Sequence, residues 1–216
     1  MARAKSGIIA GVALLMALLS PGRVPASNEA FYAKKHLFAA GVRPRGFNMI
    51  TLPPRSSYQG RFGLSKLCAD LHLGPDGEII QFDGLGQIFS HSCGSATPQF
   101  EILDGRGVIA IDTAARDGVV VGSDVFFKAV PVADLGTAPK GINLYPVDYH
   151  TALVTPEDLC LDCGLSGSAI VSRIDAGTGS VLSHGCGQVP GWSLVPGEAV
   201  LVIEDQGPRV CSPPHL

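Results

Sequence analysis

A serine set between glycines is the part of this 216-residue chain with the clearest capacity for chemistry. The run Gly164-Leu-Ser166-Gly-Ser168 follows Cys160-x-x-Cys163 and precedes an apolar, β-branched stretch. A hydroxyl becomes an effective nucleophile when a base takes its proton and donors stabilise the charge that develops on the carbonyl oxygen. Glycines permit the tight turn that would point backbone N–H groups at that oxygen. We therefore predict Ser166 as the nucleophile, with Ser168 as the runner-up and a plain glycine turn as the structural alternative.

A catalytic serine also needs a base and an orienting carboxylate. Among six histidines, His91 is favoured because a predicted strand delivers it into a loop that Cys93 would anchor. Asp117 lies just ahead of an apolar strand and is the first choice for the carboxylate. Asp112, which follows a predicted strand, and Asp148 stay open as alternatives.

The chain begins like an exported protein. Residues 1–26 combine basic Arg3 and Lys5 with an apolar run over 7–19 and small residues up to Ala26, as in a secretory signal peptide. We expect a secreted or periplasmic protein with no membrane-spanning segment after cleavage. An uncleaved anchor is the alternative, although the run is short for a bilayer. The formal net charge is −3 and the sequence holds no basic patch, so we expect no nucleic-acid partner.

Six cysteines in an exported chain are most simply three disulfides. The sequence leaves their pairing open among Cys68, Cys93, Cys160, Cys163, Cys186 and Cys211. The rival interpretation is a redox or metal site at Cys160-x-x-Cys163, for which His184 and Cys186 would supply two further zinc ligands. Pro156 and the glycines from 164 onward favour loops and strands there, so we predict no metal and no cofactor.

The pattern of short apolar runs predicts the fold class. From residue 48 onward, β-branched or alternating runs are separated by turn sequences such as those at 74–77, 104–107 and 175–179. This pattern is typical of an all-β barrel or sandwich. Helical periodicity is plausible only over residues 28–38. We find no internal repeat and expect a single domain after the leader.

These pieces resemble one family. The order His91, Asp117, Ser166 is similar to that of the trypsin-like (chymotrypsin-fold) serine peptidases, and parts are similar to the bacterial branch. The motifs that carry the resemblance are Phe89-Ser-His91-Ser-Cys93, the segment 99–106 with its Asp-Gly-Arg turn, Arg116-Asp117-Gly-Val-Val-Val121, Gly164-Leu-Ser166-Gly-Ser168 and Ser183-His184-Gly185-Cys186. They fall within residues 60–205.

The resemblance implies a fold and an activity. It implies an all-β, two-barrel domain with disulfides over residues 58–216, preceded by a lead-in segment or pro-segment at 27–57. It implies a secreted serine endopeptidase acting on protein or peptide substrates. In such an enzyme Ser166 would attack the acyl carbon, His91 would move the proton and Asp117 would orient His91.

The resemblance also implies supporting residues. Backbone N–H groups of Gly164 and Ser166 would form the oxyanion hole, and the substrate pocket would include Ser183, His184 and Gly185. The implied disulfides are Cys68–Cys93, Cys163–Cys186 and Cys160–Cys211.

Several positions depart from the family pattern. Leu165 stands where trypsin-like enzymes carry an Asp, Ser92 separates His91 from the cysteine, and Ala169 replaces the usual proline. These departures keep two alternatives open. One is a catalytically inactive trypsin-fold protein, or another secreted β-barrel, that acts as a binding or accessory protein. The other is a periplasmic redox or metal protein that uses the Cys-x-x-Cys motif.

Overall fold

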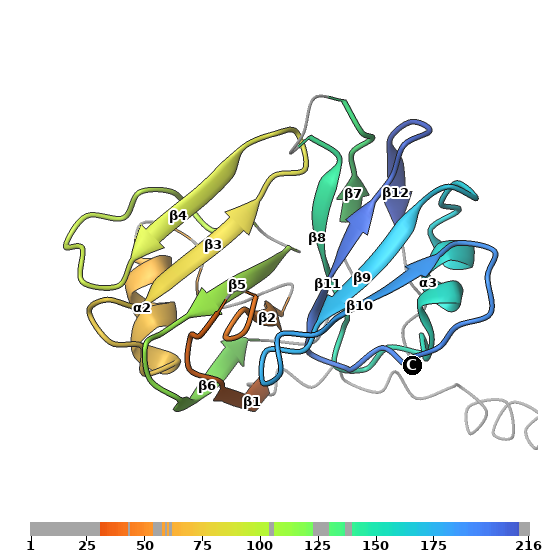
Figure 1. Ribbon diagram of the computed structural model, residues 1–216. Helices are drawn as coiled ribbons and strands as arrows, with labels where there is room; N and C mark the ends of the chain where they lie inside the picture. Colours follow the sequence, from red (N-terminus) through yellow and green to blue (C-terminus); the bar gives the residue numbers. More distant parts are fainter. Residues whose placement is uncertain are drawn as a thin grey trace, which may run out of the picture.

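The computed structural model describes residues 31–211 apart from 43, 54–57, 59, 61, 104–105, 123–129 and 137–139. The predicted signal peptide, residues 1–26, lies outside the described residues. The all-β expectation is confirmed, because strands dominate and every strand pairing in the sheets is antiparallel (Figure 1). No helix among these residues is long and apolar enough to cross a bilayer.

The strands form two halves that share one topology (Figure 1). In the first half, β1 pairs with β6 and a four-stranded sheet has the order β2-β5-β3-β4; in the second half, β7 pairs with β12 and the order is β8-β11-β9-β10. Each half also has one short helix between its second and third strands. The elements are β1 Phe31–Leu37, β2 Asn48–Thr51, α2 Gly63–Asp70, β3 Glu78–Phe82, β4 Ile88–Ser92, β5 Gly107–Ile111, β6 Arg116–Gly122, β7 Val130–Val132, β8 Ile142–Pro146, α3 Pro156–Asp162, β9 Ile170–Ile174, β10 Val181–Gly185, β11 Ala199–Ile203 and β12 Arg209–Cys211.

A buried asparagine occupies the same place in both halves. Asn48 at the start of β2 donates from Nδ2 to the carbonyl two residues earlier, to one in β5 and to one just after β1. Asn143 in β8 makes the same three kinds of bond, to the carbonyl two residues earlier, to one in β11 and to one just after β7. The residue two positions before each asparagine is a glycine with φ of 81°, Gly46 and Gly141. Such local identity indicates that the halves are two copies of one unit.

The duplication leaves a faint trace in the sequence. Leu-Cys-x-Asp-x-x-Leu begins at Leu67 in the first half and at Leu159 in the second, and Ser-His-x-Cys-Gly begins at Ser90 and at Ser183. The expectation that the chain has no internal repeat is therefore wrong. The two copies agree mainly at cysteines, glycines and polar anchors, whereas their apolar residues differ in type, since many apolar side chains fill a strand face equally well.

Equivalent disulfides staple helix to strand in the two halves. Cys68–Cys93 ties α2 to the end of β4, and Cys160–Cys186 ties α3 to the end of β10. The third bond joins Cys163 to Cys211 in β12. Three disulfides and the Cys68–Cys93 pairing are thus confirmed, whereas the implied pairings Cys163–Cys186 and Cys160–Cys211 are wrong. Cys160 lies within α3 and bonds to the residue that follows β10, whereas Cys163 follows the last residue of α3 and bonds to β12.

Strand β1 and helix α3 differ from the sequence-based expectation. Residues 31–37, within the predicted helical segment 28–38, form β1 because pairing with β6 outweighs a weak helical periodicity. The Cys-x-x-Cys segment, expected in a loop, lies at the C-terminal end of α3. Thr155 and Asp158 form a capping box at the start of this helix, with the proline at its first position.

The lead-in segment is part of the sheets. It contributes β1 and β2, and β2 pairs with β5 along its whole length. The boundary expected between residues 57 and 58 therefore has no counterpart in the strand pairing. The two-barrel arrangement is not confirmed either, because no sheet closes into a barrel within the part of the chain that the structure describes.

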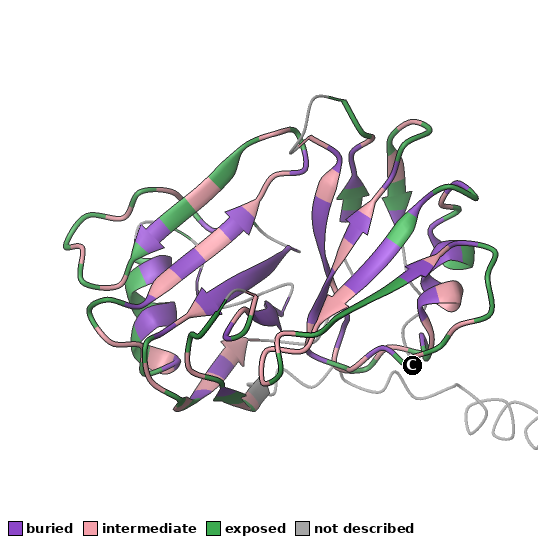
Figure 2. Ribbon diagram, in the orientation of Figure 1, coloured by how far each residue is buried: buried purple, intermediate pink, exposed green. Residues whose placement is uncertain are grey.

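The halves pack face to face. Each has its own core of buried residues, and a third cluster with Met49, Ile109, Leu144 and Ala199 lies between them. Figure 2 shows that buried residues run along β5, β8 and β11, the strands nearest the middle of the molecule. The contacts are also reciprocal at the hairpin tips. The N–H of Gly46 donates to the β9–β10 turn at 2.8 Å, and that of Gly141 to the β3–β4 turn at 2.7 Å.

Gly107 is one of the places where the two halves approach closely. It begins β5, Ala199 begins β11, and a Cβ on Gly107 would lie 2.4 Å from the Cβ of Ala199. We expect Gly107→Ala to lower the free energy of unfolding by about 1–3 kcal/mol through overpacking. The exchange variant Gly107→Ala/Ala199→Gly is expected to recover most of that loss, since the methyl group only changes sides. Chemical denaturation measures both.

Gly191→Ala is the matched control, because a Cβ there meets nothing within 4 Å. We expect its stability to stay close to that of the wild type. An exchange variant no more stable than Gly107→Ala alone would contradict the close approach of the two halves.

Candidate functional site

The predicted base, His91, is a buried residue of the first half. It lies in β4 with 1% of its surface exposed, and its Nδ1 contacts Oε1 of Gln99 at 2.6 Å. Its Nε2 is buried without a partner among the described residues. Asp117 is an exposed residue of β6 that pairs with His36 at 2.7 Å. A glutamine, rather than the predicted carboxylate, therefore contacts the imidazole.

The predicted nucleophile, Ser166, belongs to the second half. Its Oγ donates to Oδ1 of Asp205 at 2.9 Å, and Ser168 Oγ donates to the same oxygen at 2.6 Å. Within the part of the chain that the structure describes, no histidine contacts either hydroxyl. In Figure 1 the end of β4 lies beside α2, on the opposite side of the molecule from the connection between α3 and β9. The structure does not bring His91, Asp117 and Ser166 together.

The predicted oxyanion donors are already engaged. The N–H of Gly164 donates to the carbonyl of Leu161 at 3.1 Å, and the N–H of Ser166 donates to Oε2 of Glu204 at 3.0 Å. An oxyanion at the second position would meet the carboxylate of Glu204, and like charges at hydrogen-bond distance repel. These donors therefore serve the loop itself.

The serine loop has a counterpart in the first half that contains no serine. Leu73 and Gly74 occupy the places of Leu165 and Ser166 in the repeated sequence. The second residue after each helix has nearly the same left-handed φ, 56° at His72 and 57° at Gly164. The loop geometry is thus a property of the repeated unit, and a nucleophile is not needed to explain it.

A buried carboxylate anchors each of these two loops. Asp112 follows β5 and accepts from the N–H of Gly74 at 2.6 Å; Glu204 follows β11 and accepts from the N–H of Ser166 at 3.0 Å. Each also accepts from the N–H two residues further on. An arginine lies beside each carboxylate, Arg116 at 3.2 Å from Asp112 and Arg209 at 3.6 Å from Glu204. Asp112, the alternative triad carboxylate, is therefore a structural anchor.

Hydrogen bonding sets the charge state of both anchors. Burial alone would raise the pKa of Asp112, but hydrogen bonds from Gly74, Ala114 and Arg116 outweigh it and lower that pKa. The pKa of Glu204 is lowered in the same way, with burial opposed by hydrogen bonds from Ser166, Gln206 and Asp205. Both groups are therefore carboxylates at neutral pH. The third candidate, Asp148, accepts from the N–H of Tyr149 at 2.6 Å.

The predicted substrate-pocket residues lie on β10, an edge strand. Ser183 Oγ contacts the hydroxyl of Ser172 at 2.9 Å. The side chain of His184 is buried, and its Nε2 contacts Oε2 of Glu157 at 2.8 Å. The histidine of the pocket predicted around Ser183, His184 and Gly185 is thus already engaged in an internal hydrogen bond with Glu157.

A cleft does exist between the two halves. It encloses about 270 Å³, close to the lower end of the range for ligand sites. Its walls come from β1, β2 and the residue after β1 in the first half, and from the end of β9 and the residue before β11 in the second. The charged lining residues are Lys35, His36, Arg173, Asp175 and Glu198. Sequence reasoning missed this site because its residues are scattered singly along the chain.

Lys35 is a cation of the cleft with no carboxylate within ion-pair distance among the described residues. Its Nζ donates to the carbonyl of Gly197 at 2.7 Å and lies 4.9 Å from the ring centroid of Tyr149. Burial lowers the pKa of this ammonium, and the charge of Glu198 only partly opposes the effect. Glu198 is instead bonded to Arg173 at 2.9 Å. An anionic group entering the cleft would find Lys35 available.

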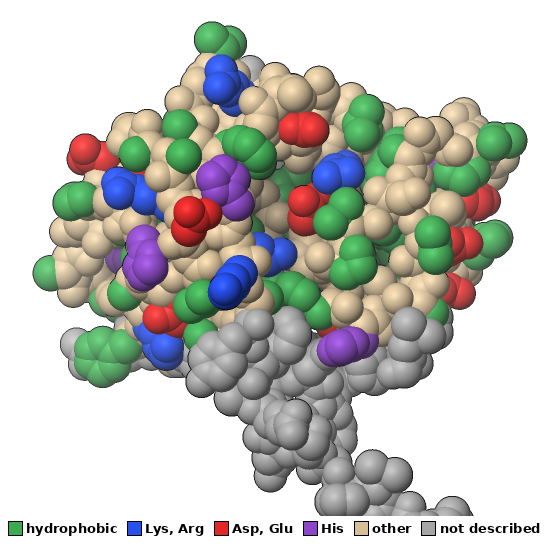
Figure 3. Space-filling model, turned by 90° about the horizontal axis from the view of Figure 1, so that it is seen from below, with side chains coloured by type: hydrophobic (Ala, Val, Ile, Leu, Met, Phe, Trp, Pro, Cys, Tyr) green, Lys and Arg blue, Asp and Glu red, His purple; other side chains and the backbone are tan. Residues whose placement is uncertain are grey.

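The surface around β1 is mixed in charge. Figure 3 views the molecule from below, on the side where β1 lies, and shows acidic, basic and histidine side chains interspersed with apolar ones. Such a surface favours a small, locally recognised group over a large polyanion.

No family model, curated protein or solved structure matches this chain.

Proposed function

We propose that this protein is an exported, non-catalytic binding protein, and that the cleft between its two halves binds a small ligand through a carboxylate group. The observation that carries the proposal is Lys35, a partly buried ammonium with spare donors and no carboxylate partner within ion-pair distance in the described structure. Fixed charge in a partly desolvated cleft binds an anion more strongly than an exposed lysine does.

The supporting geometry is the two-half construction. Ligand clefts are common where two folded units meet, since the walls are held by separate cores and the floor by the interface. Three disulfides and a predicted signal peptide fit an exported protein of this kind. The hydrolase hypothesis receives no comparable support, because no histidine of the described residues contacts Ser166 and the N–H of Ser166 donates to the carboxylate of Glu204.

Replacing Lys35 by methionine tests the proposal. We expect free-acid tripeptides to bind the wild-type protein in calorimetry or thermal-shift measurements, and Lys35→Met to weaken that binding at least about tenfold, the equivalent of 1.4 kcal/mol. Lys35→Arg is expected to retain part of the affinity. Peptides with amidated C-termini are the ligand control. Because the pKa of Lys35 lies below its ordinary value of 10.5, binding should weaken as the pH rises toward that value.

Two results would overturn this proposal. Equal affinity for acid and amide peptides, or an unchanged affinity in Lys35→Met, would show that the cleft does not recognise a carboxylate through Lys35.

Fluorophosphonate labelling tests the rival function, serine hydrolysis, in parallel. We expect no label on Ser166, whereas a label that disappears in both Ser166→Ala and His91→Ala would support the hydrolase.

A further inference from the structure

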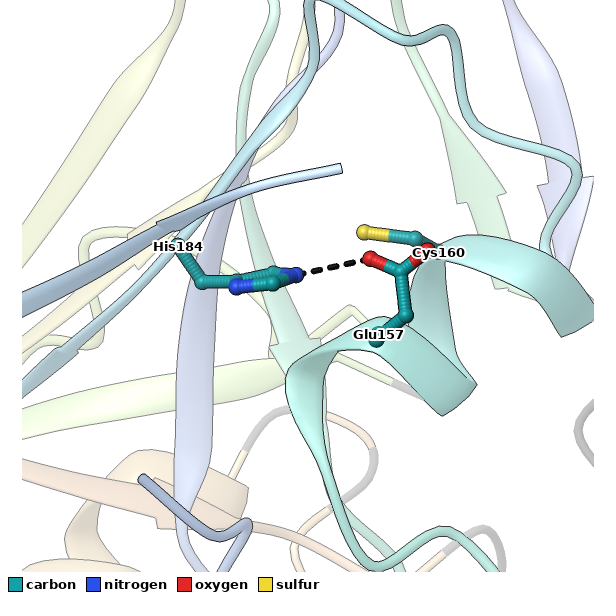
Figure 4. A group of neighbouring side chains, drawn as sticks. All are labelled: Glu157, Cys160 and His184. Atoms are coloured by element: carbon teal, nitrogen blue, oxygen red, sulfur yellow. Dashed lines mark hydrogen bonds and ion pairs between the residues drawn. The ribbon is translucent and has the colours of Figure 1, made fainter. Parts of the chain in front are cut away.

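Four side chains with metal-ligating atoms meet between α3 and the end of β10. Glu157 and Cys160 lie on one face of the helix, three residues apart, and His184 points at them from the strand (Figure 4). The ligating atoms of these three residues all lie within 4.8 Å of one another. Cys186, two residues after His184, is held at the same place by its bond to Cys160.

The residue types suit zinc. Thiolate, imidazole and carboxylate are the groups that bind Zn²⁺, and structural sites take four of them in a tetrahedron. Residues three apart on a helix share a face, and residues two apart in an extended strand share a face. The helix would therefore supply one oxygen and one sulfur, and the strand one nitrogen and one sulfur.

Hydrogen bonds hold the carboxylate of Glu157 in place within this cluster. Glu157 accepts a hydrogen bond from the backbone N–H of Gly187 in addition to the contact with His184. The His184 side chain is only 3% exposed, so it shields this side of the cluster from water.

We propose that the Cys160–Cys186 disulfide masks a tetrahedral zinc site formed by Glu157, Cys160, His184 and Cys186, and that a dithiol reductant opens it. The dithiol passes two electrons and two protons to the disulfide, which breaks into two thiols, and is itself oxidised to a disulfide. Zinc then displaces one proton from each thiol and is neither oxidised nor reduced.

The first half is an internal control. Cys68, Cys93 and His91 occupy the same positions there, but Ser65 stands where the second half has Glu157. The buried Nε2 of His91 accordingly lacks the partner that Nε2 of His184 has. Since one of four ligands is replaced by a hydroxyl, only the second half is expected to bind zinc tightly.

The test uses the full exported chain and Co²⁺ as a spectroscopic substitute for Zn²⁺. The protein is reduced with dithiothreitol, desalted without oxygen and titrated with the metal. We expect one ion per reduced chain, with thiolate-to-cobalt charge-transfer absorption that zinc abolishes, and no such absorption in the oxidised protein. Glu157→Ser, which copies the first half, should weaken binding at least about tenfold, and Ser65→Glu should raise the stoichiometry from one to two.

Circular dichroism keeps the test decisive if reduction unfolds the chain. In that case one equivalent of zinc is expected to restore the strand spectrum of the wild type but not that of Glu157→Ser, since metal binding and folding are then coupled. Binding of equal strength in the wild type and Glu157→Ser, or no binding by the reduced wild type, would overturn the proposal.

Discussion

Replacing Glu204 by alanine is expected to lower the free energy of unfolding by about 3–5 kcal/mol, the usual effect of removing one partner from a buried charged network. Its side chain is fully buried and accepts from the N–H groups of Ser166, Asp205 and Gln206. Alanine would leave these donors without their acceptor and would remove the carboxylate that lies 3.6 Å from the Arg209 guanidinium. Asp112→Ala is expected to have a similar effect in the first half. Equilibrium denaturation in urea or guanidinium measures both.

Matched variants separate the network from general effects of removing an acid. Glu204→Gln keeps the shape and one acceptor oxygen, and is expected to be less harmful than Glu204→Ala. Asp76→Ala removes an exposed carboxylate and is expected to change stability by less than about 0.5 kcal/mol. If Glu204→Ala were as mild as Asp76→Ala, the anchoring role of the carboxylate would be wrong.

The same carboxylates make stability depend on pH. The folded pKa values of Asp112 and Glu204 lie below their ordinary values of 3.8 and 4.5. Their contribution is therefore complete above the unfolded pKa values and is lost as the pH falls through the folded ones. We expect the midpoint of thermal unfolding to fall steeply below about pH 4. Glu204→Gln should flatten that decline, and an unchanged acid profile would contradict the assignment.

Removing either of the two equivalent disulfides is expected to cost about 3–4 kcal/mol, and nearly the same amount in each half. The cysteine pairs Cys68–Cys93 and Cys160–Cys186 span 25 and 26 residues, so the entropy restored to the unfolded chain is nearly equal. The Cys163–Cys211 pair spans 48 residues, and its loss is expected to cost roughly 0.6 kcal/mol more. Paired Cys→Ala variants avoid free thiols, and denaturation curves give the three values.

Unequal losses would be informative. If one equivalent disulfide proved dispensable while the other was essential, the two halves would not be energetically equivalent, despite their shared topology. The Cys163–Cys211 bond has no counterpart in the first half, where Leu71 occupies the place of Cys163. It therefore serves as the internal comparison for a bond that belongs to one copy alone.

The resemblance to serine peptidases came from features that the duplication explains. Ser-His-x-Cys-Gly occurs in both halves, so the histidine before a cysteine is a position of the repeated unit. Gly164 lies two residues after the end of α3, as His72 does after α2 in the other half. Short motifs in the right order suggested a triad, but order along the chain does not require proximity in space.

The sequence by itself determined the β-rich class and the use of six cysteines in three disulfides, because turn residues, β-branched runs and cysteine content act locally or by simple count. Only the tertiary structure decided the duplicated topology, the pairing of Cys160 and Cys163, and the partners of His91, Asp117 and Ser166. It alone assembled the cleft around Lys35 and Arg173, and the cluster at Glu157. The reason is that these arrangements depend on contacts between residues far apart in the chain. Hydrophobic faces and buried carboxylates fix such contacts when the two halves pack, and no local pattern encodes them.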